Sequence, residues 1–169
     1  MKKIYLDREQ NTGLTIIVFA EGTILKPKSL LSLYRHNAYV PIGNAVNIIS
    51  LWAQQGANII YCTSRRKKKA DAMANILKKY NFSGLCLVAR EGKESYADVV
   101  AALLPNILIE DNCKSIGGAW QMCITKVNPK IKENIKSIIV PEFKGIDALA
   151  DNIKRLIDTS AKPSLLGGE

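Results

Sequence analysis

The sequence lacks any apolar run long enough to cross a lipid bilayer. Its most apolar stretches, residues 14–19 and 107–109, are only as long as a strand, whereas a membrane-spanning helix needs roughly 20 apolar residues. The basic N-terminus continues into charged residues 7–9, where a secretion signal would have an apolar core. We therefore expect a cytoplasmic protein with no membrane partner.

Histidine and paired cysteines are also too scarce for a zinc site. The four cysteines form no Cys-x-x-Cys pair, and His36 is the single histidine, whereas zinc sites combine several such ligands at short spacings. Three of the cysteines lie in or directly after apolar runs, where a reduced cysteine behaves as a small buried hydrophobic residue. We expect neither zinc nor disulfides.

Internal repeats are absent, and the basic run at residues 65–69 is the only low-complexity tract. A chain of 169 residues, 47% hydrophobic and 23% charged, has the size and composition of one ordinary globular domain. We expect a single domain over residues 1–158, followed by a frayed C-terminal tail over residues 159–169.

Apolar, β-branched runs alternate with helical patterns along the chain. Strands separated by helices of about a dozen residues favour right-handed βαβ units. The pattern thus predicts an α/β fold, a three-layer, doubly wound parallel sheet of about five strands. We predict strands over residues 14–19, 58–62, 84–88, 106–110 and 136–140, and helices over residues 42–55, 66–80, 93–104 and 146–157.

Polar residues follow several of these strands, at the end where doubly wound sheets bind their ligands. Residues 19–23, Phe-Ala-Glu-Gly-Thr, follow the first strand, and residues 63–65, Thr-Ser-Arg, follow the second. Lys93 precedes the fourth strand, which ends in residues 110–112, Glu-Asp-Asn. Each segment alone has an ordinary structural explanation, such as a turn or a helix cap. Their order along the chain is the informative feature.

In this order the segments resemble the four motifs of the haloacid dehalogenase (HAD) superfamily of phosphohydrolases, in its capless form. Members of the family attack phosphorus with a carboxylate, and a second carboxylate handles the protons while cations neutralise the phosphoryl oxygens. The resemblance, over residues 14–150, implies an acid/base role for Glu21, phosphate binding by Gly22, Thr23, Thr63, Ser64, Arg65 and Lys93, and magnesium support from Glu110, Asp111 and Asn112.

The first motif departs from the family at its nucleophile. Phe19 stands where the family has its catalytic aspartate. A benzyl group can neither attack phosphorus nor ligate Mg²⁺, which takes oxygen ligands, and in the family the same aspartate also helps to hold the metal. We expect Mg²⁺ binding and phosphatase activity to be weak or absent.

Too few residues separate the motifs to form a cap domain. In the family, open sites of this kind go with large substrates or with a neighbouring subunit that covers the site. A homo-oligomer is therefore one expectation, and packing of the same side chains onto their own domain is the other. The side chains concerned are Leu30, Leu31, Leu33, Tyr34 and Tyr39.

The net charge of +9 favours an anionic partner, either a phosphorylated small molecule or another polyanion. The basic run at residues 65–69 continues into Lys78 and Lys79. It lacks the interleaved aromatic residues that stack on bases in single-strand binding proteins. Binding to nucleic acid therefore stays an alternative to binding a phosphorylated small molecule.

Three functions are compatible with these features. In the first, the chain binds a phosphorylated ligand at the carboxyl ends of the strands, with phosphatase activity weak or lost because of Phe19. The second is an active, Mg²⁺-dependent, capless phosphohydrolase that acts on a nucleotide or a larger phosphorylated substrate. The third is a basic module that binds nucleic acid or another macromolecule.

Overall fold

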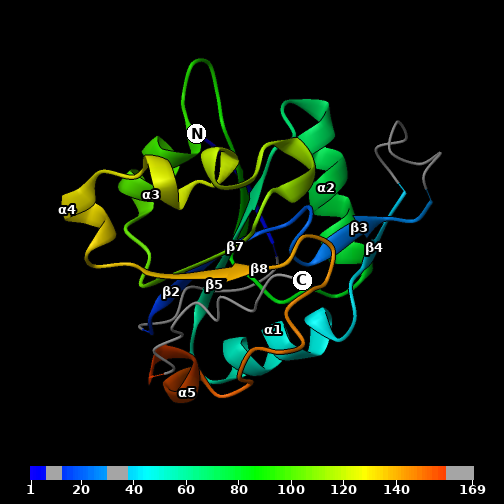
Figure 1. The fold of residues 1–169 in the computed structure, drawn as a ribbon. Coiled ribbons are helices and arrows are strands. Elements are labelled where there is room, and N and C mark those ends of the chain that lie inside the picture. Colours follow the sequence, from blue (N-terminus) through cyan, green and yellow to red (C-terminus); the bar gives the residue numbers. More distant parts are fainter. Residues whose placement is uncertain (7–12, 30–37, 159–169) are drawn as a thin grey trace, which may run out of the picture.

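A computed structural model describes residues 1–6, 13–29 and 38–158. In these ranges six strands form one sheet in the order β1-β6-β5-β2-β7-β8, and two more form a hairpin, β3-β4 (Figure 1). All neighbouring strands of the large sheet are parallel except β1, which is antiparallel to β6. The strands are β1 (Lys2–Tyr5), β2 (Thr15–Phe19), β3 (Leu25–Pro27), β4 (Tyr39–Pro41), β5 (Asn58–Thr63), β6 (Cys86–Ala89), β7 (Ile107–Asp111) and β8 (Lys136–Val140).

Helices cover both faces of the sheet (Figure 1). One hydrophobic cluster joins the sheet to α1 (Ala45–Gln54), α2 (Lys68–Lys79) and α5 (Ile153–Asp158). A second cluster on the opposite face joins it to α3 (Tyr96–Leu103), α4 (Pro129–Lys132) and the short 3₁₀-helix η4 (Ile124–Lys126). The predicted α/β fold with three layers is therefore confirmed.

The central strands are buried on both faces. Every residue of β5 and β7 is buried, which explains why parallel strands appear in the sequence as continuous apolar runs rather than alternating ones. The side chains of β2 still point alternately to the two faces of the sheet. Ile16 and Val18 belong to the cluster under α1, whereas Ile17 belongs to the cluster under α3.

The path of the chain sets the position of the ligand site. From the central strand β2 the chain proceeds outward through β5 to β6, and then returns to the other side of β2 through β7 and β8. Strand order reverses between β2 and β7, and doubly wound sheets bind ligands in the crevice beyond the carboxyl ends at such a reversal. Residues after Phe19 and at Asp111 flank that crevice.

Two strand features were not predicted from the sequence. The edge strand β1, which makes the sheet mixed rather than wholly parallel, has the short polar sequence KKIY and alternates between half-buried and exposed residues. The hairpin β3-β4 pairs Leu25 with Pro41 and Pro27 with Tyr39. Three-residue strands give too short a pattern for recognition from sequence.

All four predicted helices begin later than expected, and α1 and α2 do so by only two or three residues. The helix predicted from residue 93 begins at Tyr96, because Ser95 caps it and forms a reciprocal capping box with Asp98. The last helix begins at Ile153 rather than at residue 146.

Between β7 and β8 the chain also forms unpredicted short helices. These are η2 (Lys114–Ile116), η3 (Gly118–Gln121), η4 and α4.

Some expectations fall on residues that the structure does not describe. The contact expected of Leu30, Leu31, Leu33 and Tyr34 lies outside the described residues, and so does the tail at residues 159–169. Tyr39 is described, and its side chain is buried within its own chain. Across the described ranges, no helix has the length and apolar character needed to span a membrane.

Trp52 of α1 provides a test of the core. Its side chain is fully buried and its Nε1–H donates to the carbonyl oxygen of Ala150 at 2.9 Å. We expect Trp52→Ala to lower the free energy of unfolding by roughly 3–5 kcal/mol, measured by urea denaturation. Leu51→Ala, one residue away but 40% exposed, should cost less than about 1 kcal/mol. Equal costs would contradict the assigned packing of α1.

Candidate functional site

A cavity of about 180 Å³ lies at the carboxyl ends of the strands, where the strand order reverses. Its walls come from the ends of β2, β5 and β7, from the start of α3, and from the loop after β8. Aromatic rings and carboxylates dominate the lining, above all Phe19, Tyr39, Tyr96, Glu21, Asp111 and Glu142.

The turn after β2 brings Gly22 against Asp111. Gly22 has φ +82, and its N–H donates to the carbonyl oxygen of Leu25 at 3.0 Å. A Cβ atom at this position would lie 2.4 Å from Asp111 Oδ2. Both the positive φ and the close approach therefore require glycine. The next residue, Thr23, is fully buried, and its hydroxyl donates to Asp111 Oδ2 at 3.5 Å.

One oxygen of Glu21 interacts with three polar side chains at the end of β5 and directly after it. Glu21 Oε1 accepts from the Thr63 hydroxyl at 2.7 Å and from the Ser64 hydroxyl at 3.1 Å, and lies 3.4 Å from Arg65 Nε. The Glu21 side chain is only 15% exposed. Three of the groups expected to bind phosphate thus converge on a carboxylate of the same chain.

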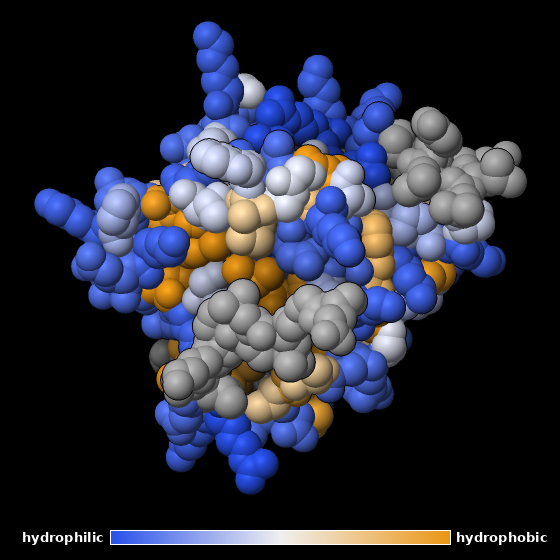
Figure 2. All heavy atoms as spheres, in the orientation of Figure 1, coloured by the Kyte–Doolittle hydropathy of each residue, from blue (hydrophilic) through white to orange (hydrophobic). Residues whose placement is uncertain are grey.

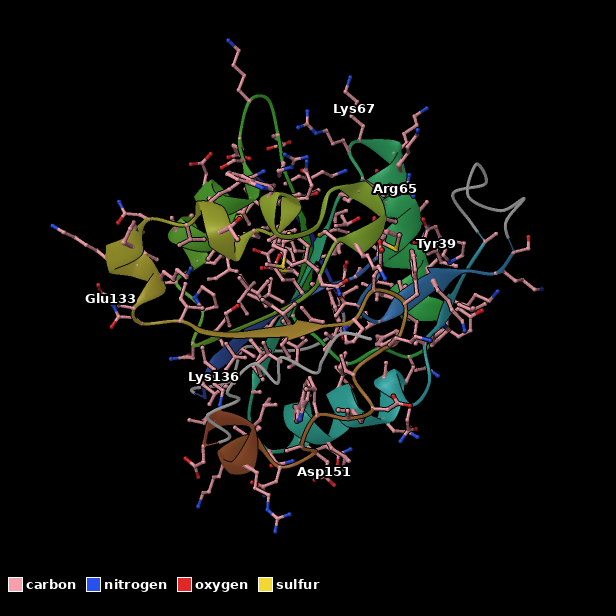
Figure 3. The ribbon with its side chains drawn as sticks, viewed as in Figure 1. Tyr39, Arg65, Lys67, Glu133, Lys136 and Asp151 are labelled. Carbon is pink, nitrogen blue, oxygen red and sulfur yellow. The ribbon has the colours of Figure 1, made fainter. Side chains whose placement is uncertain are left out.

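Arg65 links this cluster to the hairpin. Its guanidinium donates to the Tyr39 hydroxyl at 2.6 Å and lies 5.7 Å from the centroid of the Tyr39 ring, and Figure 3 shows the two side chains next to each other. The Arg65 N–H donates to the Thr63 hydroxyl oxygen at 3.1 Å. The hydroxyl of Thr63 therefore both donates and accepts, which holds the loop after β5 in one conformation.

Phe19 is part of an aromatic stack. Its ring meets the ring of Tyr96 edge to face, with centroids 5.1 Å apart, and the guanidinium of Arg90 lies 4.0 Å from the Tyr96 centroid on that ring. Burial raises the pKa of Tyr96 above its usual value of 10.0, so its neutral hydroxyl donates to the carbonyl oxygen of Thr63 at 3.2 Å. Where the sequence resemblance placed a nucleophile, the structure thus has a packed aromatic side chain.

Glu110 holds the segment between β7 and β8 in place. Its two carboxylate oxygens accept from the N–H groups of Cys123 and Ile124 at 2.6 and 2.9 Å. These amides lie at the start of η4, so the carboxylate caps that helix. Burial raises the pKa of Glu110 above its usual value of 4.5, and the two amides oppose this shift.

The other residues expected to support magnesium also bind within the chain. Asp111 Oδ1 accepts from the N–H of Cys113 at 2.8 Å, and Asn112 Oδ1 accepts from the N–H of Glu142 at 3.1 Å. Burial raises the pKa of Asp111, and the neighbouring Glu142 carboxylate raises it further. Glu142 in turn accepts from the N–H and hydroxyl of Ser115.

This arrangement does not fit a magnesium ion. Mg²⁺ requires near-octahedral oxygen ligands, but Phe19 contributes no oxygen and Glu110 and Asn112 accept from backbone amides. Over the ranges that the structure describes, no three histidine, cysteine, aspartate or glutamate side chains are grouped to hold a metal ion.

Lys93 lies away from these residues. It is exposed in the turn before α3 and does not line the cavity. Arg90, which directly follows β6 and lies on Tyr96, was not selected from the sequence. Its position directly after the third apolar run was the available signal, since Ser64 directly follows β5 in the same way.

The approach of Gly22 to Asp111 can be tested against a second glycine. Gly22→Ala should lower the free energy of unfolding by about 2–4 kcal/mol, because it combines a positive φ with a clash. Gly56→Ala is the matched control, since Gly56 has φ +93 but an added Cβ would meet nothing within 4 Å. It should cost about 1 kcal/mol, measured by the same denaturant titration. Equal losses would show that Asp111 does not constrain the turn.

We expect Glu110 to stabilise the fold, and we expect its contribution to depend on pH. Glu110→Gln should lower the free energy of unfolding by about 1.5–3 kcal/mol at neutral pH, since an amide cannot accept from both N–H groups. Glu133 is exposed and directly follows α4. As the control, Glu133→Gln should change the free energy of unfolding by less than about 0.5 kcal/mol.

The pH dependence follows from the raised pKa of Glu110. Because the folded chain binds this proton more tightly than the unfolded chain, stability falls as pH rises from below 4.5 through the folded pKa. Glu110→Gln should reduce that fall, measured by denaturant titrations across the acidic range. An unchanged pH profile would contradict this assignment.

No family model and no curated protein matches the sequence. Among solved structures, the chain is similar to one in the Pnkp1/Rnl/Hen1 RNA repair complex, with a TM-score of 0.56 and 15% identity over 82% of this chain and 46% of the other. The present chain thus spans about half the length of that relative. At this identity the likeness establishes the fold alone.

Two further similar structures have lower TM-scores. One is D,D-heptose 1,7-bisphosphate phosphatase from Burkholderia thailandensis, with a TM-score of 0.45 and 9% identity over 78% of this chain and 94% of the other. The other is a universal stress protein in complex with cAMP, with a TM-score of 0.39 and 14% identity over 76% of this chain and 96% of the other.

Proposed function

We propose that the chain binds the phosphate group of a ligand at the carboxyl ends of its strands and does not hydrolyse it. The observation that carries the proposal is the convergence of Thr63, Ser64 and Arg65 on Glu21 Oε1. Two hydroxyls and a guanidinium that surround one anionic oxygen form an anion receptor. Glu21 fills this receptor, and a phosphoryl oxygen offers the same negatively charged acceptor.

The proposal requires ligand phosphate to compete with Glu21. Glu21 lies at a turn rather than inside a strand. Its side chain can therefore move away from Thr63, Ser64 and Arg65 while β2 stays in place. The carboxylates of Asp111 and Glu142 line the same cavity, and they repel phosphate from that side. The phosphate therefore belongs on the side of Thr63, Ser64 and Arg65.

Lack of hydrolysis follows from the contacts around Phe19. A hydrocarbon ring packed on Tyr96 offers no lone pair for attack on phosphorus. The nearby carboxylate of Asp111 accepts from the Cys113 amide and the Thr23 hydroxyl. The site has no nucleophile and does not fit Mg²⁺. We therefore infer that it binds phosphate but does not catalyse phosphoryl transfer.

The cavity limits what can enter the site. Its volume of about 180 Å³ is below the roughly 300–1,000 Å³ of pockets that enclose a small molecule. We infer that it receives a phosphate group and a few neighbouring atoms, and that the remainder of the ligand lies outside it.

The competition can be measured by calorimetric titration with inorganic phosphate. We expect Glu21→Gln to tighten the dissociation constant about tenfold, because it frees Arg65 from its counter-charge, and 1.4 kcal/mol corresponds to a factor of ten. Arg65→Ala should abolish binding. Glu133→Gln changes the net charge by the same amount on a distant surface and should leave the affinity unchanged. A weaker affinity in Glu21→Gln would contradict the proposal.

A phosphatase assay of the pure protein with and without Mg²⁺ tests the second half of the proposal. We expect no turnover of phosphomonoesters by the wild type. We expect none by Phe19→Asp either, because Glu110 and Asn112 still accept from backbone amides and do not complete a Mg²⁺ site. Mg²⁺-dependent turnover by the wild type that disappears in Glu21→Gln would instead support an active phosphohydrolase.

A further inference from the structure

A second depression at the carboxyl edge of the sheet is strongly basic. It has a volume of about 660 Å³ and lies between the start of α2 and the loop that follows β6. We call it the basic groove. Figure 2 shows hydrophilic side chains gathered over this part of the molecule, and in Figure 3 Lys67 projects outward there. Five basic side chains line it, namely Lys2, Arg66, Lys67, Lys68 and Arg90.

The acidic side chains in the groove do not neutralise this charge. Asp71 binds Lys2, with Oδ1 and Nζ 2.7 Å apart. Glu91 lies 3.4 Å from the amino group of Met1. Four cations, those at positions 66, 67, 68 and 90, therefore face the groove without a carboxylate partner among its described lining residues.

The two walls of the groove are joined, and one of them presents an unsatisfied donor. Arg66 Nη1 donates to the carbonyl oxygen of Gly92 at 3.3 Å, which ties the segment before α2 to the loop after β6. The Arg90 guanidinium is held on the Tyr96 ring. Its Nε is buried and has no hydrogen-bond partner among the residues that the structure describes. A buried donor without an acceptor is costly, and this one belongs to a residue that lines the groove.

We propose that the basic groove binds a small molecule that carries two or more adjacent phosphate groups. Its volume lies inside the roughly 300–1,000 Å³ typical of small-molecule sites. Four cations within one depression match several negative charges close together. None of its described lining residues is aromatic, so it has no platform for stacking bases, which single-strand nucleic-acid binding uses.

This proposal is separate from the anion receptor at Glu21. Arg65 lies in that receptor and the basic groove begins at Arg66, so neighbouring residues serve the two sites. The groove keeps its charge whether or not phosphate displaces Glu21. Variants of Glu21 and variants of the groove therefore report on different sites.

Tripolyphosphate is a suitable probe for the groove, with affinity measured by calorimetry at low salt. We expect the double variant Lys67→Ala/Lys68→Ala to weaken binding about tenfold or more, because two charge-assisted contacts are lost. The control Lys130→Ala/Lys132→Ala removes the same charge from the exposed surface of α4. It should leave the affinity within about twofold.

Arg90→Lys adds a test of geometry, because it keeps the charge but loses the planar, stacked guanidinium. It should weaken tripolyphosphate binding several-fold, with the fold checked by circular dichroism.

Three results would overturn the proposal: no binding by the wild type at millimolar probe, equal losses in the two double lysine variants, or tighter binding of a ten-nucleotide oligothymidylate than of tripolyphosphate. The last result would identify a nucleic-acid site. If Glu21→Gln failed to tighten the binding of inorganic phosphate while the wild type still bound tripolyphosphate, only the proposed function would be contradicted.

Discussion

The hydrogen bonds to Glu21 Oε1 connect the parts of the site to one another. They join the turn after β2 to the loop after β5, and through Arg65 they reach Tyr39 of the hairpin. A partly buried anionic oxygen with two hydroxyl donors and an adjacent guanidinium is well compensated, and without it the buried Thr63 hydroxyl would lose a partner. The conformation of the loops at the strand ends therefore depends on this carboxylate, and any anionic ligand there has to replace it.

Charge is divided along the carboxyl edge of the sheet. Carboxylates of Asp111 and Glu142 line the cavity at the reversal of strand order, whereas basic side chains line the groove over β5 and β6. The stack of Phe19, Tyr96 and Arg90 stands between them. Phe19, which carries no nucleophile, thus also packs on the ring that holds the cation of the neighbouring groove.

The sheet was predictable where burial dominates the sequence. β5 and β7 are buried on both faces, so their composition reveals them. β1 was missed because an edge strand buries little and needs few apolar residues. The start of α3 was misplaced because a reciprocal hydrogen-bonded cap with Asp98, rather than helix propensity, decides where that helix begins.

By itself, the sequence determined the fold class and the edge at which Glu21, Thr63 and Asp111 meet, because parallel strands place their carboxyl ends together. It also determined that Phe19 carries no nucleophile. Only the tertiary structure decided the partners of these groups: Glu110 caps η4, Lys93 lies away from the cavity, and Arg90 lies on Tyr96. Hydrogen bonds and ring contacts depend on distances of a few ångströms between residues far apart in the chain, and local sequence patterns contain no information about them.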